Sequence, residues 1–316
     1  MTARMTDLII HHYPTSPFSE KVRLVLGMKR VAWHSVVVPA IMPKPDVVAL
    51  TGGYRRTPFM QIGADVYCDS ALMCRVIDRL WPAPPLYPAA SAGLAEIVAQ
   101  WADTTLFWSA VPYTMQPAGI AHIFATLPAE AVKAFGADRA AMSPSMRRAP
   151  TADAGAALVA YLGRLEAMLA DGRPYLLGNA ASIADFSATQ SIWFLRRAPP
   201  VAAILDAHPR VVAWHERIAA FGQGTSTRLG SDEAIASAAE ATGHAPTTVA
   251  PGQPFAAGAA VRVAAADYAH DEILGTVVGL EDDEVVVERT DARAGTVHVH
   301  FPRIGFHIKP LTKDTP

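Results

Sequence analysis

The spacing of apolar residues changes twice along this chain, and each change marks a different class of local structure. The first part alternates short apolar runs with stretches of helical spacing. A long middle part repeats its apolar residues at helical spacing almost throughout. The last part alternates apolar and polar residues, as short strands do. The sequence therefore predicts an α/β domain at 1–82, an all-helical domain at 92–242 and a small antiparallel β barrel at 257–316.

The first part has a strand and helix order that defines its fold class. Ser16 is a good helix N-cap, Pro17 fits the first helical position and Glu20 suits the first turn. The β-α-β and β-β-α order predicts an α/β sandwich of about thioredoxin size. The candidate elements are the strand Leu8–Ile10, the helix from Ser16, the strand Val36–Val38, the hairpin 59–67 and a helix beginning at Asp69 or Ser70.

Two proline-rich stretches separate the three parts. Residues 82–88 hold four prolines and predict a stiff linker, and residues 244–258 form a second loose stretch. The strands beyond it are short and follow Gly or Asp turns, which favours a small barrel. These strand segments are Val261–Val263, Thr276–Val278, Val285–Val287 and Val297–His300.

Composition excludes several classes of protein. The formal net charge of −2 gives no electrostatic footprint for nucleic acid or an anionic membrane. The sequence has no apolar run of about 18 residues, and its start lacks the long apolar region of a signal peptide. Cys68 and Cys74 are not spaced as CxxC, so we expect them to be reduced apolar residues rather than a redox pair. We expect a cytoplasmic protein.

Four segments in register resemble the glutathione transferase superfamily. They are residues 16–23, 55–59 and 69–70 in the first part and 178–185 in the helical part. The resemblance covers roughly residues 7–230 and implies a thioredoxin-like domain joined to a helical bundle. It implies that the 182–185 segment starts a buried helix as a capping box. The final β region lies outside the resemblance, so its role stays open.

Ser16 lies where serine-type members of this superfamily keep the hydroxyl that activates the glutathione thiol. A free thiol has a pKa of about 8.5, and lowering it by two units needs about 2.7 kcal/mol of preference for the thiolate. A hydrogen bond to a charged group supplies about 1.5–3 kcal/mol. One hydroxyl at a helix N-terminus is therefore sufficient. Tyr13 is the rival, because other branches use a tyrosine at this strand end, and Ser19 is a weaker one.

The resemblance also implies the glutathione-binding set. Thr57 and a cis Pro58 would pair with the cysteinyl part, and Asp69-Ser70 would hold the γ-glutamyl group. Arg56, or Arg55 in its place, would hold the glycyl carboxylate, and an electrophile pocket would lie between the domains. The predicted residues are Phe18, Arg56, Thr57, Pro58, Asp69 and Ser70 for glutathione, and Trp108 and Tyr113 for the electrophile.

These residues predict a glutathione transferase that uses glutathione as co-substrate and acts on a small hydrophobic electrophile. We expect a homodimer that binds neither nucleic acid nor a membrane. A non-catalytic scaffold is the first alternative, because the appended β region could be a binding module. A glutathione-dependent redox protein is the second. We expect no metal, because His298 and His300 on one strand face lack a third ligand nearby in the sequence.

Overall fold

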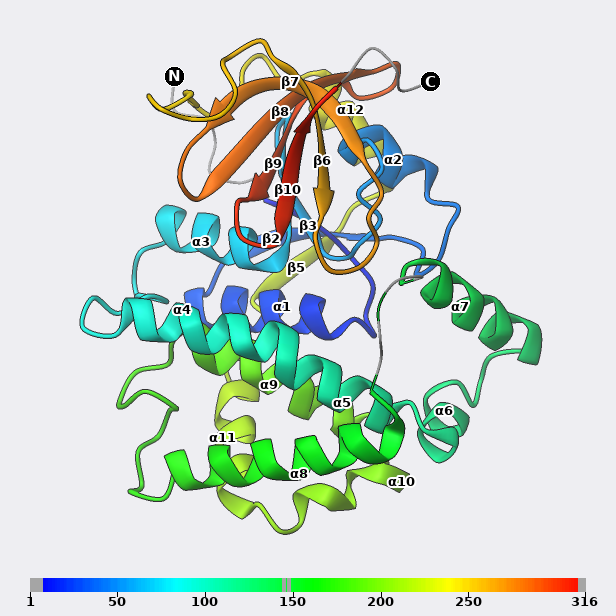
Figure 1. The fold of residues 1–316 in the computed structure, drawn as a ribbon, viewed down its shortest axis with the longest axis vertical. Coiled ribbons are helices and arrows are strands. Elements are labelled where there is room, and N and C mark those ends of the chain that lie inside the picture. Colours follow the sequence, from blue (N-terminus) through cyan, green and yellow to red (C-terminus); the bar gives the residue numbers. More distant parts are fainter. Residues whose placement is uncertain (1–7, 144–145, 147–148, 312–316) are drawn as a thin grey trace.

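A continuous twisted sheet forms the upper half of the computed structural model, and a helical bundle forms the lower half (Figure 1). The structure describes residues 8–143, 146 and 149–311. Within them ten strands pair in the order β10-β6-β7-β8-β9-β4-β3-β1-β2-β5. The strands are β1 (Ile9–His12), β2 (Ala32–Val37), β3 (Phe59–Ile62), β4 (Asp65–Cys68), β5 (Thr225–Arg228), β6 (Ala260–Ala265), β7 (Ile273–Leu280), β8 (Glu284–Asp291), β9 (Gly295–Pro302) and β10 (Phe306–Pro310).

The thioredoxin-like order expected from the sequence is confirmed. β1 pairs in parallel with β2 across α1 (Pro17–Lys29), and β3 and β4 form the antiparallel hairpin that precedes α3 (Ser70–Leu80). Ser16 caps α1, because its Oγ accepts a hydrogen bond from the N–H of Ser19 at 3.2 Å. The short helix α2 (Pro45–Thr51), which the pattern did not predict, lies between β2 and β3.

The C-terminal strands differ from the expected separate barrel. β9 pairs in parallel with β4, so the β region continues the sheet of the thioredoxin-like domain. Among the described residues no pairing joins β9 to β10, so the strands form an open sheet. The physical reason is that β4 ends its hairpin with unpaired N–H and C=O groups, which β9 satisfies. Both parts also share one hydrophobic core, in which Ile9 and Leu50 belong to the same cluster as Val287 and Phe301.

The helical domain also ends earlier than the expected limit at 242. The bundle closes with α11 (Pro209–Ala219), after which Gly222 and Gly224 take positive φ and turn the chain back to the sheet. There β5 pairs in parallel with β2, and α12 (Ser231–Ala239) packs on α2 and β9. β5 is fully exposed and all polar, so hydrophobic spacing gave no sign of it.

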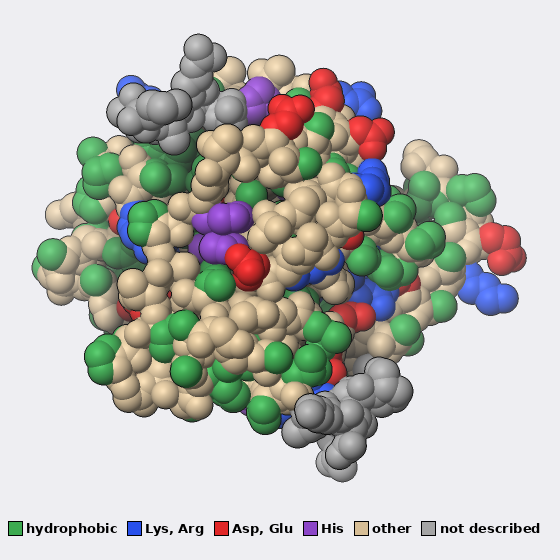
Figure 2. All heavy atoms as spheres, turned by 90° about the horizontal axis from the view of Figure 1, so that it is seen from above, with side chains coloured by type: hydrophobic (Ala, Val, Ile, Leu, Met, Phe, Trp, Pro, Cys, Tyr) green, Lys and Arg blue, Asp and Glu red, His purple; other side chains and the backbone are tan. Residues whose placement is uncertain are grey.

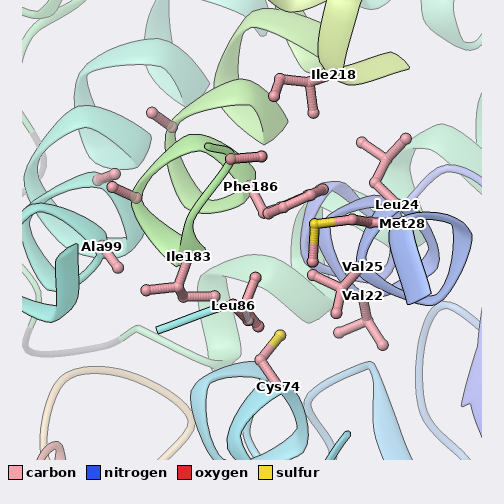
Figure 3. Close-up of a cluster of buried hydrophobic side chains, with 14 of the residues drawn as sticks. Val22, Leu24, Val25, Met28, Cys74, Leu86, Ala99, Ile183, Phe186 and Ile218 are labelled. Atoms are coloured by element: carbon pink, nitrogen blue, oxygen red, sulfur yellow. The ribbon is translucent and has the colours of Figure 1, made fainter. Parts of the chain in front are cut away.

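The bundle packs against the thioredoxin-like domain through α1. Figure 3 shows Val22 and Val25 of α1 in one apolar cluster with Phe186 and Ile183 of the helix α9 (Ile183–Arg196). Burial of such side chains contributes about 1.5–3 kcal/mol each. The remaining helices are α4 (Ala92–Trp101), the π-helical segment Ala102–Leu106, α5 (Phe107–Thr114), α6 (Pro117–Ile123), α7 (Ala129–Ala141), α8 (Thr151–Met168), α10 (Pro199–Ala202) and the 3₁₀ turn Ala203–Leu205.

The predicted capping box at the start of α9 is present and structural. The Asp185 carboxylate accepts hydrogen bonds from the Ser182 and Leu176 N–H groups at 2.9 and 2.8 Å and from the Trp214 indole at 2.9 Å. Asp185 is fully buried and so serves the bundle rather than a site. No helix within the described residues is long and apolar enough to cross a bilayer.

Candidate functional site

Two adjoining cavities open between the sheet and the bundle. The first has a volume of about 440 Å³ and lies between the start of α1, α5 and α7. The second, of about 240 Å³, lies over the start of α3. They share the wall residues Phe18, Arg56, Thr57, Trp108 and Tyr268.

Ser16 lies at the first cavity, with its side chain placed by the start of α1. It is 2% exposed, and its Oγ lies 3.3 Å from the carbonyl oxygen of Thr57, to which it donates. The Thr57-Pro58 bond is cis, as the resemblance implies. The Ser16 Oγ also accepts a hydrogen bond from the Ser19 N–H. The hydroxyl proton can therefore turn to a ligand atom in the cavity while the cap bond is kept.

Tyr13 lines the same cavity, so the rival hydroxyl is present as well. Its oxygen accepts a hydrogen bond from the Arg139 guanidinium at 3.4 Å. This contact ties the Tyr13 hydroxyl to α7. Geometry alone therefore brings both Ser16 and Tyr13 to one cavity.

Asp69 and Ser70 line the second cavity at the start of α3. Asp69 takes a φ of +75°, and its carboxylate accepts from the Ala71 N–H at 2.8 Å. A non-glycine residue in that region costs about 1–3 kcal/mol, and such strain gathers at functional sites. The helix start and the Ser70 hydroxyl form a polar pocket suited to a carboxylate.

The buried ion pair of Lys21 and Asp103, which the sequence did not reveal, contacts the Ser70 hydroxyl. Lys21 of α1 is fully buried, and its Nζ lies 2.6 Å from Asp103 and 3.4 Å from the Ser70 hydroxyl. Gln190 donates to the same carboxylate at 2.7 Å. Burial lowers the pKa of Lys21, but Asp103 more than offsets this, so that its pKa lies above the usual value. Asp103 belongs to the π-helical segment, a distortion that is frequent at functional sites.

Arg56 is already engaged by the C-terminal β region. Its guanidinium donates to the Asp267 carboxylate and to the Tyr268 carbonyl oxygen, and it lies 3.9 Å from the centre of the Tyr268 ring. The Tyr268 ring meets Trp108 edge to face at 5.4 Å. The loop between β6 and β7 thus forms part of the wall of both cavities. The Arg56 charge predicted to face a ligand carboxylate instead faces a carboxylate of the chain itself.

A second group of cations lies at the first cavity, and sequence reasoning missed its key member. Lys44 is buried, and its Nζ donates to the Arg55 carbonyl at 2.9 Å. Burial, with the nearby Arg139 charge, lowers the pKa of Lys44 to about 8. Arg55 is paired with Asp138. Lys44 therefore presents a positive charge at the cavity wall near neutral pH, and the short helix that begins at Pro45 was the available signal.

The structure brings one of the two residues predicted for the electrophile to the cavities. Trp108 lines both cavities, together with Val111, Pro112 and Met115. These four positions share one face of α5, at offsets of three, four and seven residues. Tyr113 lies off that face, is not among the residues that line either cavity, and packs on the core beside Gly155 of α8. Phe18, predicted for glutathione, lines both cavities, and its ring centre lies 4.7 Å from that of Phe107.

The cysteines match the expectation of inert thiols. Cys68 and Cys74 are free and fully buried. Burial raises the pKa of Cys74 to about 12 and places that of Cys68 well above its usual value. Neither thiol is poised to act as a nucleophile.

The fold combines a thioredoxin-like domain with a helical bundle, and the Ser16 hydroxyl at the start of α1 lies at the cavity between them. Residues 10–85 match the glutathione S-transferase N-terminal domain, and residues 144–217 match the glutathione S-transferase C-terminal domain. A solved structure of a GST-like protein from Pseudomonas syringae is 40% identical, covers 97% of this chain and 100% of its own, and superposes with a TM-score of 0.78. This chain belongs to the glutathione transferase superfamily.

Two further relatives match only part of this chain. Glutathione transferase F7 from Populus trichocarpa shares the fold at 18% identity, with a TM-score of 0.51; the match covers 67% of this chain and 93% of the poplar protein. Pyrimidodiazepine synthase from Drosophila melanogaster is 32% identical over 76 residues, which are 23% of this chain and 31% of that protein. The Pseudomonas syringae match, in contrast, spans the C-terminal β region as well.

Proposed function

We propose that this protein is a glutathione transferase in which Ser16 donates its hydroxyl hydrogen bond to the glutathione thiolate. The observation that carries the proposal is the position of Ser16, which is buried, caps α1 and faces the cavity 3.3 Å from the Thr57 carbonyl. The hydrogen bond and the positive end of the helix dipole both favour the thiolate over the thiol.

The two cavities suit the ends of the tripeptide. The γ-glutamyl carboxylate would bind at the start of α3 through Ser70, with its amine near Asp69, and the cysteinyl backbone would pair with Thr57. Lys44 is the better candidate for the glycyl carboxylate, because the Arg56 charge is already paired with Asp267. The glycyl end would then lie in the larger cavity.

The electrophile would bind beside the sulfur against the apolar face of α5. Phe107, Trp108, Val111 and Met115 form this wall, and Tyr268 closes it from the C-terminal region. A cavity of about 440 Å³ fits a small hydrophobic molecule next to the sulfur. Conjugation of such compounds would serve detoxification in the cytoplasm.

A non-catalytic scaffold is the second candidate, favoured by the Arg56–Asp267 pair that joins the β region to the site. Calorimetry separates the two functions at their first step. We expect glutathione and S-methylglutathione to bind near pH 7, and no detectable binding at millimolar ligand would support the scaffold.

The same titration has a pH dependence that identifies Lys44. Since its pKa in the free protein is about 8, the affinity for S-methylglutathione should be flat below pH 8 and fall towards about tenfold per pH unit above it. S-methylglutathione has no thiol to titrate, and a step that comes from its own α-amine is the same in every variant. Lys44→Arg should keep the affinity to higher pH, and Lys44→Met should bind weakly and lose the part of the fall above pH 8 that belongs to Lys44. An equal fall in affinity in the wild type and in Lys44→Met would exclude this assignment.

We propose a homodimer in which α4 packs against a second copy. Leu94 and Ile97 on α4 are 54% and 70% exposed, which is unusual for adjacent large apolar side chains. Light scattering should give twice the chain mass of 33.6 kDa. Ile97→Glu should yield the monomer, whereas Val159→Glu, at an exposed site on α8, should not. A dimer that tolerates Ile97→Glu would place the interface elsewhere.

A further inference from the structure

A cluster of metal-ligand side chains lies where the C-terminal β region joins the thioredoxin-like sheet. Asp65 begins β4, His298 is its partner on β9, and His244 lies on the chain between α12 and β6. One donor atom from each lies within 4.8 Å of the others. The sequence expectation of no metal rested on two histidines without a third ligand, and the fold supplies that ligand from distant positions. Figure 2 shows histidine side chains side by side, next to an acidic side chain, on the upper face of the molecule.

His298 has a nitrogen that points into the cluster without a hydrogen bond. The residue is 8% exposed, and its Nδ1 has no hydrogen-bond partner among the described residues. This Nδ1 lies 4.0 Å from the Asp65 carboxylate. Its other nitrogen, Nε2, lies 3.4 Å from the Glu288 carboxylate. That arrangement fixes Nε2 as the N–H side and leaves the Nδ1 lone pair free, as in histidines that bind metals.

His244 repeats the pattern from the other side. Its ring stacks on that of His298 with centres 3.6 Å apart, and its buried Nδ1 lies 3.9 Å from the same Asp65 oxygen. This nitrogen also has no hydrogen-bond partner within the described part of the chain. An unsatisfied buried polar atom is destabilising, so two that converge on one carboxylate indicate a shared ligand.

The Asp65 carboxylate is held in place by groups outside the cluster. Its Oδ2 accepts from the Ala245 N–H at 2.8 Å, and its Oδ1 lies 2.9 Å from His300 Nε2. The other nitrogen of His300 lies 2.6 Å from Glu284. Three carboxylates, from Asp65, Glu284 and Glu288, thus surround the histidines and make the site attractive to a cation.

We propose that Asp65, His244 and His298 bind one divalent transition-metal ion of the zinc class, with a water in the fourth position. Two imidazole nitrogens and one carboxylate oxygen form a donor set that suits Zn²⁺, with bonds of about 2.0–2.2 Å. Tetrahedral bonds of that length bring donors to about 3.3 Å from each other. The two rings are stacked nearly parallel, with an angle of 13° between their planes, so at least one of them has to rotate on binding to direct both nitrogens at a single ion.

The ion would fasten three separate segments: the β3–β4 hairpin, the chain between α12 and β6, and β9. It lies on the strand pair that joins the C-terminal region to the rest of the sheet. Its role is therefore structural, and its loss should loosen the C-terminal region first. This inference does not depend on the glutathione chemistry, because none of the three residues lines the cavities of that site.

The test is a zinc titration of the untagged, metal-stripped full chain against a chromophoric chelator. We expect one equivalent of Zn²⁺ to bind, and His244→Gln and His298→Gln to lower the affinity at least 10²-fold. His307→Gln is the matched control, because His307 is exposed on β10 of the same region. Free zinc at about 100 times its Kd should raise the melting temperature by about 5 °C in the wild type and in the control.

If the protein does not bind zinc at a concentration of about 10⁻⁴ M, the proposal is overturned. Wild-type affinity in His244→Gln would overturn it as well. If His298→Gln fails to fold, His244→Gln decides the question, because residue 244 lies on a partly exposed loop.

Discussion

Ser16→Ala should lower the turnover of a glutathione transferase assay by about 10²-fold, while glutathione still binds. The hydroxyl is the group placed to stabilise the thiolate, and a loss of about 2.7 kcal/mol of that stabilisation corresponds to this factor. The thiolate absorbance of bound glutathione should then titrate near pH 8.5, the value of the free thiol. Binding should persist, because the carboxylate contacts proposed for Ser70 and Lys44 do not involve Ser16.

Tyr13→Phe is the control for this prediction, because Tyr13 brings a second hydroxyl to the same cavity. It should leave the turnover within a few-fold of the wild type. Full activity in Ser16→Ala combined with a large loss in Tyr13→Phe would transfer the role to Tyr13. Loss of the N-cap also costs stability, typically about 1 kcal/mol, so unfolding should be measured in parallel.

Asp103→Leu should destabilise the protein by about 3–5 kcal/mol, because it leaves the fully buried Lys21 charge without its partner. The same change removes the acceptor of Gln190 and Ser187 from α9. Urea unfolding of the wild type and the variant measures the effect.

The double variant Lys21→Met with Asp103→Leu separates the charge from the packing. It should recover most of the lost stability, because an apolar pair of similar volume often replaces a buried ion pair without cost. Asp171→Ala, which breaks an exposed pair with Arg173, should leave the midpoint unchanged. A double variant no more stable than Asp103→Leu would show that the hydrogen bonds of Asp103, rather than the Lys21 charge, set the cost.

The parts of the fold and site that the sequence predicted depend on local signals. Ser16 before Pro17 marks a helix start, and apolar spacing separates the helical part from the strands. Asp69 and Ser70 likewise mark the start of α3, which the structure confirms. Tyr113 shows the limit of such signals, because an aromatic residue on a helix does not reveal which face will meet a cavity.

The features that the sequence did not predict depend on contacts between distant residues. Asp103 meets Lys21, and Asp267 meets Arg56, across long stretches of chain that no periodicity connects. The pairing of β9 with β4 is of the same kind, because strand propensity does not specify a partner. Lys44 was missed although Pro45 marks a helix start beside it, since a lysine before a short helix is normally a solvated charge.

The β4–β9 pair has a consequence for how the chain is made. β4 is synthesised before the whole helical bundle, whereas its partner β9 follows the bundle. While the bundle is being synthesised the edge of β4 is therefore open, and an open edge can pair with strands of other chains. A chain that stops between the bundle and β9 would expose this edge permanently, so such a truncation should yield an aggregating product rather than a smaller functional one.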